Sequence, residues 1–221
     1  MLPALDPVGA RVLGCLIEKE RLTPQAYPLT LNALVTACNQ ATGREPVMEL
    51  DESQVMDALG ELRSESLTRT VHPRSGRGVT KYRHVVDEVF SLEGGPMAVL
   101  CLLLLRGEQT AAELRSRSER MHDFEDQGEV DDVLAELSER GFATELPRRP
   151  GQSATRWTTT WGRGPVGVSS QESPVAVVPP VAVPTGAVDD EDIWSEVDEL
   201  RREVAMLRAS LDEVRRELGL S

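Results

Sequence analysis

The sequence is poor in aromatic residues and has no long apolar run. Aromatic residues make up 4% of its 221 positions, so any core must be built mostly from Leu, Val and Ala. The longest apolar run, residues 97–105, is far shorter than the roughly 20 residues that a membrane-spanning helix needs. Acidic residues within the first 20 positions also argue against a signal peptide. These absences predict a cytoplasmic protein with no membrane contact.

Cysteine and histidine are too scattered to indicate a metal or catalytic site. The three cysteines show neither paired spacing nor the spacing of metal ligands, and the three histidines are isolated. No glycine-rich phosphate loop follows an expected strand. We therefore predict a protein that is not an enzyme and has no cofactor, no metal and no small-molecule substrate. The cysteines, which we expect to be reduced and buried, are Cys15, Cys38 and Cys101.

A basic overall balance, which nucleic-acid binders usually show, is also missing. The formal net charge is -13. Residues 1–165 hold 19 Lys and Arg against 25 Asp and Glu, and residues 166–221 hold 5 against 12. Any contact with DNA must therefore come from a local basic patch.

One pattern occurs twice in the chain, at a shift of 75 positions. In each copy, apolar residues at helical spacing are followed by a short strand, a Gly-containing basic turn and a second strand with an aromatic residue. This order is typical of the third helix and wing of a winged helix-turn-helix. The matching positions are Val55, Leu59, Leu62, Leu67, Gly76, Thr80 and Tyr82 in the first copy, and Val130, Leu134, Leu137, Phe142, Gly151, Thr155 and Trp157 in the second.

The repeat predicts two tandem winged helix-turn-helix domains, at residues 1–90 and 91–162. Such domains are mainly α-helical with small β-hairpins, an α+β class, and each copy is long enough to bury its own core. Residues that cap helix N-termini mark where helices begin. They are Asp6, Thr30, Asp51 with a Gln three residues later, and Thr110 with a Glu three residues later.

The first copy is longer than the second before its third helix. Val12–Leu16 match Val99–Leu103 at an offset of 87, and we align Thr23 with Thr110 at the same offset. Because the offset is 75 from Val55 onward, the first copy carries 12 extra residues between Thr23 and Val55.

These extra residues include a loop rich in turn formers, from residue 39 to residue 48. A loop added to a repeated unit is a place for a special role, so we treat it as a candidate partner loop. A harmless insertion is equally possible, and Arg44 could instead support the structure by pairing with a nearby acidic residue. The candidate residues are Asn39, Gln40, Arg44, Glu45 and Pro46.

The composition changes after residue 162. Residues 163–187 are mostly Pro, Val, Gly and Ser, which predicts a flexible linker. In residues 188–221, apolar residues recur at alternating spacings of four and three, with Glu at g and Arg at e positions, which favours a parallel homodimeric coiled coil. The alternative is a helix that folds back onto the winged domains. The expected seam is Ile193, Val197, Leu200, Val204, Leu207, Leu211, Val214 and Leu218.

Several stretches of residues 5–160 resemble the YceH-like family of bacterial proteins. The family implies two tandem winged-helix domains and has no established biochemical role. The stretches that carry the resemblance are Leu16–Lys19, Thr23–Pro24, Tyr27–Leu29, Val35–Gln40, Arg44–Met48, Val79–Tyr82, Leu103–Gly107 and Glu113–Arg117.

The charges of the individual elements do not favour insertion of a third helix into DNA. Residues 51–65 contain five carboxylates against Arg63, and residues 126–140 contain six against Arg140, so phosphates would meet negative charge. Positive charge gathers on the hairpins and on the second helix of the second domain. The candidate nucleic-acid contacts are Arg69, Arg74, Arg77, Lys81, Arg83, Arg115, Arg117, Arg148 and Arg149. An alternative is that these arginines pair with the acidic third helices, between domains or between subunits.

Two functions from different classes follow from these observations. In the first, a dimeric winged-helix protein contacts DNA phosphates through its basic wings and acts in transcription regulation. In the second, the acidic third helices and the loop at residues 39–48 form the surface of a protein-protein interaction scaffold. The fold cannot decide between them, because one fold supports many functions.

Overall fold

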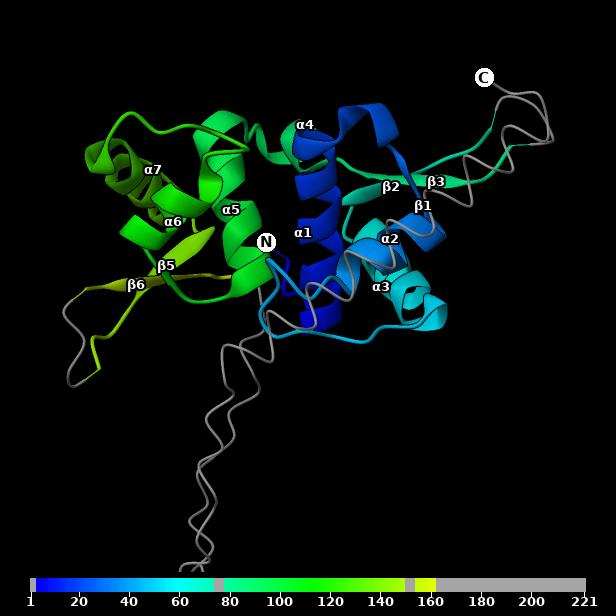
Figure 1. The fold of residues 1–221 in the computed structure, drawn as a ribbon, viewed down its shortest axis with the longest axis horizontal. Coiled ribbons are helices and arrows are strands. Elements are labelled where there is room, and N and C mark those ends of the chain that lie inside the picture. Colours follow the sequence, from blue (N-terminus) through cyan, green and yellow to red (C-terminus); the bar gives the residue numbers. More distant parts are fainter. Residues whose placement is uncertain (1–2, 74–77, 150–153, 162–221) are drawn as a thin grey trace, which may run out of the picture. The chain divides into compact units, whose positions relative to one another are not determined.

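The computed structural model describes residues 3–73, 78–149 and 154–161. These residues form seven α-helices and two small antiparallel sheets, so the expected mainly helical α+β class is confirmed (Figure 1). The helices are α1 (Pro7–Leu22), α2 (Leu31–Cys38), α3 (Glu52–Ser64), α4 (Val86–Phe90), α5 (Gly94–Arg106), α6 (Ala111–Ser118) and α7 (Gln127–Glu139), with a 3-10 turn, η1 (Pro24–Ala26). The strands are β1 (Leu29–Thr30), β2 (Thr68–Val71), β3 (Lys81–His84), β4 (Gln109–Thr110), β5 (Ala143–Leu146) and β6 (Arg156–Thr159).

The helices begin at the capping residues that the sequence indicates. Asp6, Thr30, Asp51 and Thr110 each accept a hydrogen bond from the backbone N–H three residues later. Both expected capping boxes are present, at the starts of α3 and α6. These bonds satisfy backbone donors that the first turn of a helix leaves without an intrahelical partner.

The two sheets have the same topology. In the first, β3 lies between β1 and β2, and in the second β6 lies between β4 and β5, with every pair antiparallel. Tyr82 of β3 lies opposite Leu29, and Trp157 of β6 lies opposite Gln109. We call α1–β3 the first copy and α5–β6 the second copy. Each consists of three helices and a three-stranded sheet.

The alignment of Thr23 with Thr110 is wrong. Thr110 is the last residue of β4 and the N-cap of α6, and in the first copy both roles belong to Thr30. The offset at this point is therefore 80, so the extra residues of the first copy lie in two places. Seven precede Thr30, around η1, and five lie between α2 and α3. Sequence spacing alone misassigned the match because threonine can cap a helix at either position.

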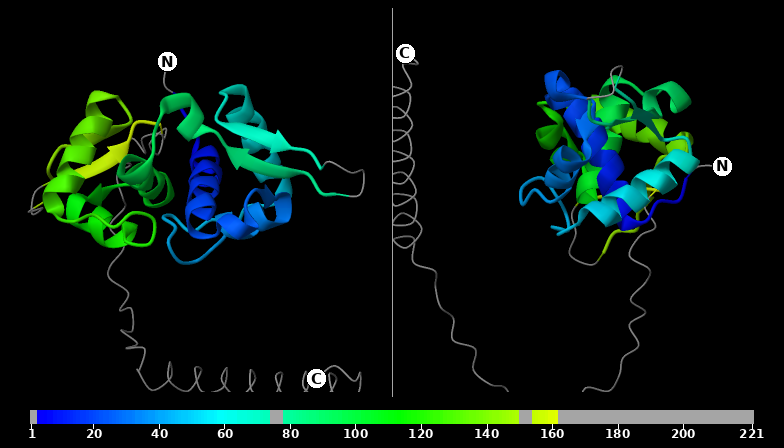
Figure 2. Two further views of the ribbon diagram at one scale, coloured as in Figure 1. Left: turned by 90° about the horizontal axis from the view of Figure 1, so that it is seen from above. Right: turned by 90° about the vertical axis from the view of Figure 1, so that its right-hand side faces the viewer.

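Helices α1 and α5 pack against each other and join the two copies (Figure 1; Figure 2). A Cβ added at Gly14 of α1 would come within 2.8 Å of the Leu105 side chain, and the Cys101 thiol donates to the Gly14 carbonyl at 3.4 Å. The buried side chains form one continuous cluster, and the described residues belong to one compact unit. Instead of two separate cores, the copies share one, because α5 is apolar around its whole circumference and must be covered on several sides.

The described chain ends beside its beginning. The Leu5 N–H, just before α1, donates to the Trp161 carbonyl at 2.6 Å. Phe90 of α4 packs against Phe142 and Trp161, with ring centroids 5.4 and 5.2 Å away. These contacts tie the linking helix α4 and the N-terminal segment to the second copy.

The remaining expectations have different outcomes. Cys15, Cys38 and Cys101 are buried and free, as expected. None of the described helices combines the length and apolar character that a bilayer-spanning segment needs. The predicted linker and the coiled-coil seam from Ile193 to Leu218 lie outside the described residues.

Candidate interaction surfaces

The arginines of the first hairpin converge on one carboxylate. Arg69 of β2 and Arg83 of β3 lie opposite each other and bind Glu88 of α4 at N–O distances of 2.7 and 2.6 Å. The hydrogen bond from Arg83 lowers the pKa of Glu88, and the charges of both arginines add to this effect. Two candidate phosphate contacts are thus partly neutralised. The other candidates of this hairpin are Lys81, half-buried on β3, and Arg74 and Arg77, which lie outside the described residues.

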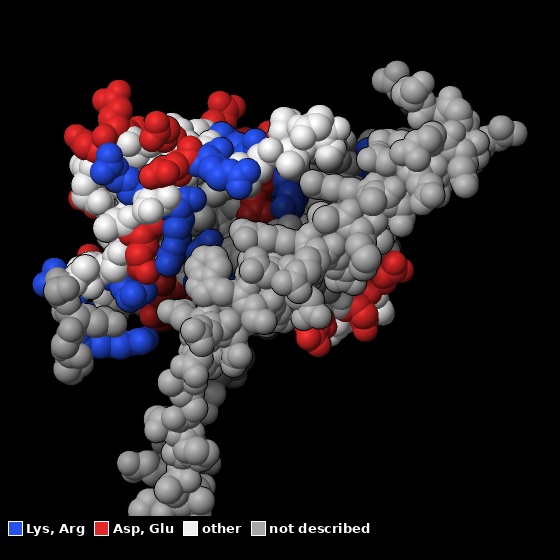
Figure 3. Space-filling view, viewed as in Figure 1, with Lys and Arg blue, Asp and Glu red and all other residues white. Residues whose placement is uncertain are grey.

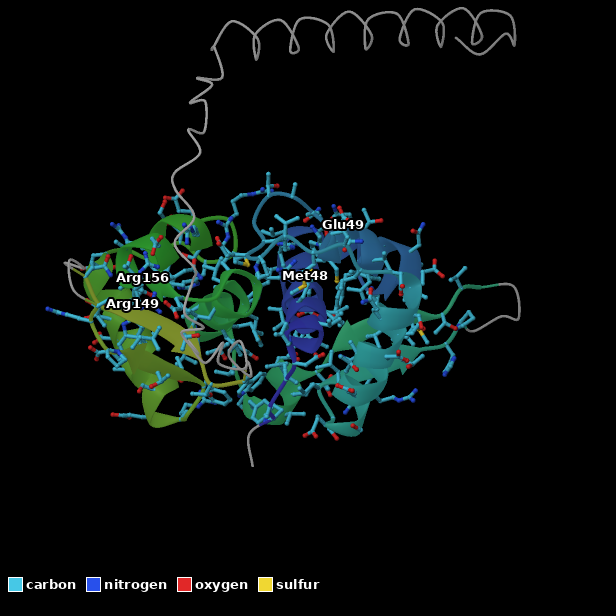
Figure 4. All side chains as sticks on the ribbon, turned by 90° about the horizontal axis from the view of Figure 1, so that it is seen from below. Met48, Glu49, Arg149 and Arg156 are labelled. Carbon is cyan, nitrogen blue, oxygen red and sulfur yellow. The ribbon has the colours of Figure 1, made fainter. Side chains whose placement is uncertain are left out.

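Arginines of the second copy are bound mainly by two glutamates near β4. Arg149 binds a carboxylate oxygen of Glu108 at 3.2 Å. Arg156 lies close to it on the same hairpin (Figure 4) and contacts the Glu108 carbonyl at 2.9 Å and Glu113 at 3.4 Å. Arg117 also binds Glu113, at 3.2 Å. The basic groups of α6 and the hairpin are therefore held together by carboxylates between them.

Two further candidates are bound by neutral oxygens. Arg115 donates to the Glu125 carbonyl at 2.9 Å, and Arg148 donates to the Thr155 hydroxyl at 3.2 Å. Both side chains are exposed, and neither contact neutralises the positive charge. Arg115 and Arg148 therefore keep more capacity for an anionic partner than Arg117 or Arg156.

Within one chain, none of the described candidate arginines forms an ion pair with a third helix; pairing between subunits stays a prediction. The carboxylates that bind the candidate arginines belong to α4, to the segment before β4 and to α6. These groups lie next to the hairpins in space, although nothing in the sequence spacing marks them as partners. Among the described residues, the carboxylates of α3 form no ion pair, whereas Glu136 of α7 pairs with Arg140 at the end of the same helix.

The exposed face of α3 is acidic. Glu52, Asp57 and Glu61 are exposed, and none of them forms an ion pair within the described residues. Acidic groups are visible in Figure 3 at the lower right, where Figure 1 labels α3. In the second copy, Asp131 and Asp132 are exposed on α7 in the same way. Either helix would bring carboxylates toward phosphates if it entered a DNA groove.

Exposed apolar side chains lie beside the acidic face of α3. Met56 of α3 is 43% exposed, and Val79, just before β3, is 67% exposed. The Tyr82 hydroxyl donates to the Met56 sulfur at 3.4 Å, so these side chains adjoin across the helix and the sheet. Large apolar residues exposed together are more typical of protein interaction surfaces than of surfaces that bind phosphate.

The loop between α2 and α3 is anchored by hydrogen bonds rather than left free. The Asn39 amide both donates to and accepts from the Leu50 backbone, at 2.8 and 2.7 Å. The Glu45 N–H donates to the Leu105 carbonyl at 2.9 Å, at the C-terminal end of α5. Met48 is half-buried against the core in this loop (Figure 4). The loop therefore closes over the junction of the two copies.

Arg44 belongs to this loop, and its side chain is buried. Its guanidinium binds both carboxylate oxygens of Glu18 on α1, at 2.9 and 2.6 Å. It also donates to the Ala37 carbonyl at 3.1 Å and to the Gln40 amide oxygen at 2.9 Å. The structural alternative for Arg44, pairing with a nearby acidic residue, is thus confirmed.

The pKa of Glu18 reflects this pairing. Burial alone would raise it, but the hydrogen bonds and charge of Arg44, together with nearby Lys19, outweigh burial and lower it. Glu18 is therefore ionised and compensated in the folded protein.

Arg11 is a second buried arginine at this junction. It lies in α1, is 1% exposed and donates to the backbone carbonyls of Cys38 and Pro46. Burial lowers its pKa. The two arginines bind α1 to the end of α2 and to the loop, so this part of the candidate partner loop supports the interior. Its exposed parts are residues 41–42 and 45–47, with Val47 58% exposed.

His84 is the other polar group that sequence reasoning left without a role. Its Nε2 lies 2.6 Å from a carboxylate oxygen of Glu20, and the Val86 N–H points to its Nδ1 at 3.3 Å. The hydrogen bond with His84 lowers the pKa of Glu20. Because the His84 side chain is fully buried and both ring nitrogens are engaged, we assign it a structural role.

The positions missed from sequence are Arg11, Glu18, Glu88 and Glu108. Arg11 carried a usable signal, because it interrupts an apolar stripe on a helix that proves to be buried on most sides. The other three are single glutamates outside any motif, and apart from Arg83, five positions before Glu88, the arginines that they bind are distant in sequence. Within the described ranges, no group of three or more His, Cys, Asp or Glu is placed to hold a metal ion.

The architecture defines an α+β protein made of two fused copies of one small unit, and comparison with known proteins identifies its family. A family model described as protein of unknown function, DUF480, matches residues 5–152. The chain belongs to this family of uncharacterised bacterial proteins, in agreement with the YceH-like resemblance.

Relatives match over nearly the whole chain. A UPF0502 protein of Pelobacter propionicus is 45% identical over 212 residues, 95% of each chain. A UPF0502 protein of Shewanella oneidensis is 44% identical over 215 residues, covering 92% of this chain and 94% of its own. One from Klebsiella pneumoniae is 42% identical over 217 residues, 95% of each chain. Alignments of this length extend beyond residue 162 into the C-terminal segment.

Proposed function

We propose that each copy is a winged helix and that the protein is a non-catalytic interaction protein of the bacterial cytoplasm. Three helices followed by a hairpin, with the first hairpin strand directly after the third helix, support this assignment in both copies. The third helix is the element that most winged helices place against their target, so its surface chemistry indicates the kind of partner.

The partner that best fits α3 is a basic protein segment. We define the α3 surface as Glu52, Met56, Asp57, Glu61 and Tyr82. Its carboxylates have no ion-pair partner within the described ranges, and Met56 is exposed among them. Negative charge around an apolar centre complements a segment that carries Lys or Arg beside an apolar residue. This unpaired acidic face, at the position of a recognition helix, carries the proposal.

The test is a comparison of proteins captured by two charge-matched variants of the full-length chain. Asp57→Lys with Glu61→Lys reverses the α3 surface, and Glu119→Lys with Glu139→Lys makes the same change of charge at exposed sites of the second copy. We expect a partner that is captured by wild type and by the Glu119/Glu139 variant but not by the Asp57/Glu61 variant. Equal capture by both variants would contradict the proposal.

Self-association through the C-terminal segment is part of this proposal. The heptad pattern in residues 188–221 supports a parallel coiled coil, with Glu203 of one chain near Arg208 of its partner. Relatives that align over 95% of the chain include this segment. A dimer would present two α3 surfaces and raise the effective affinity for a partner with two binding segments.

DNA binding is the second candidate, and the exposed arginines of the second copy favour it. Among the described residues, the contacts of Arg115 and Arg148 are with neutral oxygens, and Arg149 follows Arg148 in the same hairpin. A few phosphate contacts from such a group would give weak binding with strong salt dependence.

Duplex DNA retention from about 50 to 200 mM salt tests this candidate. If the hairpin contacts phosphates, Arg148→Glu with Arg149→Glu abolishes retention at low salt, whereas Arg63→Glu on α3 leaves it unchanged. Retention that is absent in wild type, or unchanged in the Arg148/Arg149 variant, would exclude the hairpin as a DNA contact.

A further inference from the structure

The second copy has a hollow on its surface. It has a volume of about 340 Å³ and lies between the start of α6, α7 and β6, where Trp157, Asp131, Ala111, Ala154 and Gln127 border it. It is separate from the α3 surface, which belongs to the first copy.

Comparison of the two copies explains why space is available here. The equivalent of Ala111 is Leu31, at the offset of 80, and the equivalent of Ala154 is Val79, at the offset of 75. Asp131 takes the position of Met56, so two small residues and a carboxylate replace three larger apolar ones. The second copy therefore has smaller or charged side chains where the first copy has larger apolar ones. The aromatic residue at the equivalent position is Tyr82 in the first copy and the larger Trp157 in the second.

The groups around the hollow suit a positively charged side chain. The face of an indole attracts an ammonium or guanidinium group, more strongly than other aromatic rings do. Asp131 is exposed and forms no ion pair among the described residues, so its charge is available. The side-chain nitrogen of Gln127 is buried without an acceptor in this part of the structure, and a peptide carbonyl could supply one.

Nearby arginines do not cancel this preference. Arg156 precedes Trp157 on β6, so its side chain leaves the opposite face of the strand, where it contacts Glu113. Arg148 is closer, because it binds the Thr155 hydroxyl at the rim. Asp131 of α7 borders the hollow itself, whereas Arg148 contacts a residue at its rim.

We propose that this hollow receives a lysine or arginine side chain of a protein partner, with the cation against Trp157 and Asp131 as its counter-ion. The inference rests on the proposed protein-interaction function but uses a different surface, so the partner would be held at two places. Binding of the partner to the α3 surface and binding to the hollow can therefore be lost independently of each other.

The test begins with selection of random peptides displayed on phage against the full-length protein. The affinity of selected peptides is then measured by fluorescence anisotropy for wild type, Asp131→Asn and the matched control Asp132→Asn. We expect a Lys or Arg at a constant position in peptides whose binding weakens about fivefold in Asp131→Asn and less than twofold in Asp132→Asn. Replacing that basic residue by norleucine should weaken binding to wild type more than binding to Asp131→Asn, in which only the attraction of Trp157 for the cation is left to lose.

A filled variant gives an independent measurement. Ala111→Leu with Ala154→Val restores the side chains of the first copy and should block the same peptides, with an unchanged far-UV circular dichroism spectrum showing that the protein is folded. Peptides that bind Asp131→Asn and Asp132→Asn equally would overturn the proposal. If the same peptides lose binding only in Asp57→Lys with Glu61→Lys, the α3 surface is supported and the hollow is excluded.

Discussion

The guanidinium of Arg44 binds both carboxylate oxygens of Glu18, a residue 26 positions earlier in the chain, at 2.9 and 2.6 Å. This pair lies where α1, α2 and the inserted loop meet, and the next residue, Glu45, bonds to the end of α5. The insertion therefore fastens the two copies together, and a charged pair under it fixes its path.

Removal of Arg44 should destabilise the protein strongly. The Arg44 side chain is 1% exposed, and Arg44→Leu would leave the Glu18 carboxylate with Lys19 as its one remaining ion-pair partner among the described residues. We expect a loss of about 3 kcal/mol in the free energy of unfolding, measured with urea. The control is Arg69→Leu, which removes an ion pair whose arginine is 58% exposed and should cost less than about 1 kcal/mol. Similar losses in both variants would show that the Arg44 pair is not specially important.

The Glu18 pair should also make stability depend on pH. Because the pKa of Glu18 is lower in the folded protein than in the unfolded chain, its contribution is present above the unfolded value of about 4.3 and is lost as the pH falls through the folded value. The stability difference between wild type and Glu18→Gln should therefore be largest near pH 7 and shrink below about pH 4. Glu52→Gln, at an exposed site, serves as the control. A difference that stays constant from pH 7 to pH 3 would contradict the assignment.

The C-terminal segment should determine the oligomeric state. We expect the full-length chain to be a dimer by light scattering and a chain ending at residue 187 to be a monomer, because the apolar seam lies wholly in residues 188–221. Leu207→Asp, at the centre of the seam, should have the same effect without shortening the chain. A truncated protein that remains a dimer would place the interface in the two copies and support a helix folded back onto them.

Local signals in the sequence predicted the helical units well. Capping residues such as Asp51 and Thr110 fixed where helices start, because their hydrogen bonds reach only three residues along the chain. The repeated spacing also located both hairpins. It misplaced the match of Thr110, because the offset changes twice within the first copy and a threonine stands at both possible positions.

Relations between distant residues could not be predicted in the same way. The apolar run of α5 is plain in the sequence, yet spacing does not say that α1 is what covers it. The partners of the hairpin arginines are single glutamates, Glu88 and Glu108, with no motif around them. Only the packed chain shows that, among the described residues, Arg69, Arg83 and Arg149 pair with carboxylates while the carboxylates of α3 form no ion pair.

The central claim, that α3 faces a protein partner, is tested most directly by photo-crosslinking from position 56. A photoreactive amino acid replaces Met56 in the native bacterial host, and a second strain carries it in place of Glu119, which is exposed on the other copy. We predict a discrete crosslinked product from position 56 that is digested by protease, resists nuclease, is absent from position 119 and disappears in Asp57→Lys with Glu61→Lys. A product that contains DNA, or the same products from both positions, would contradict the account.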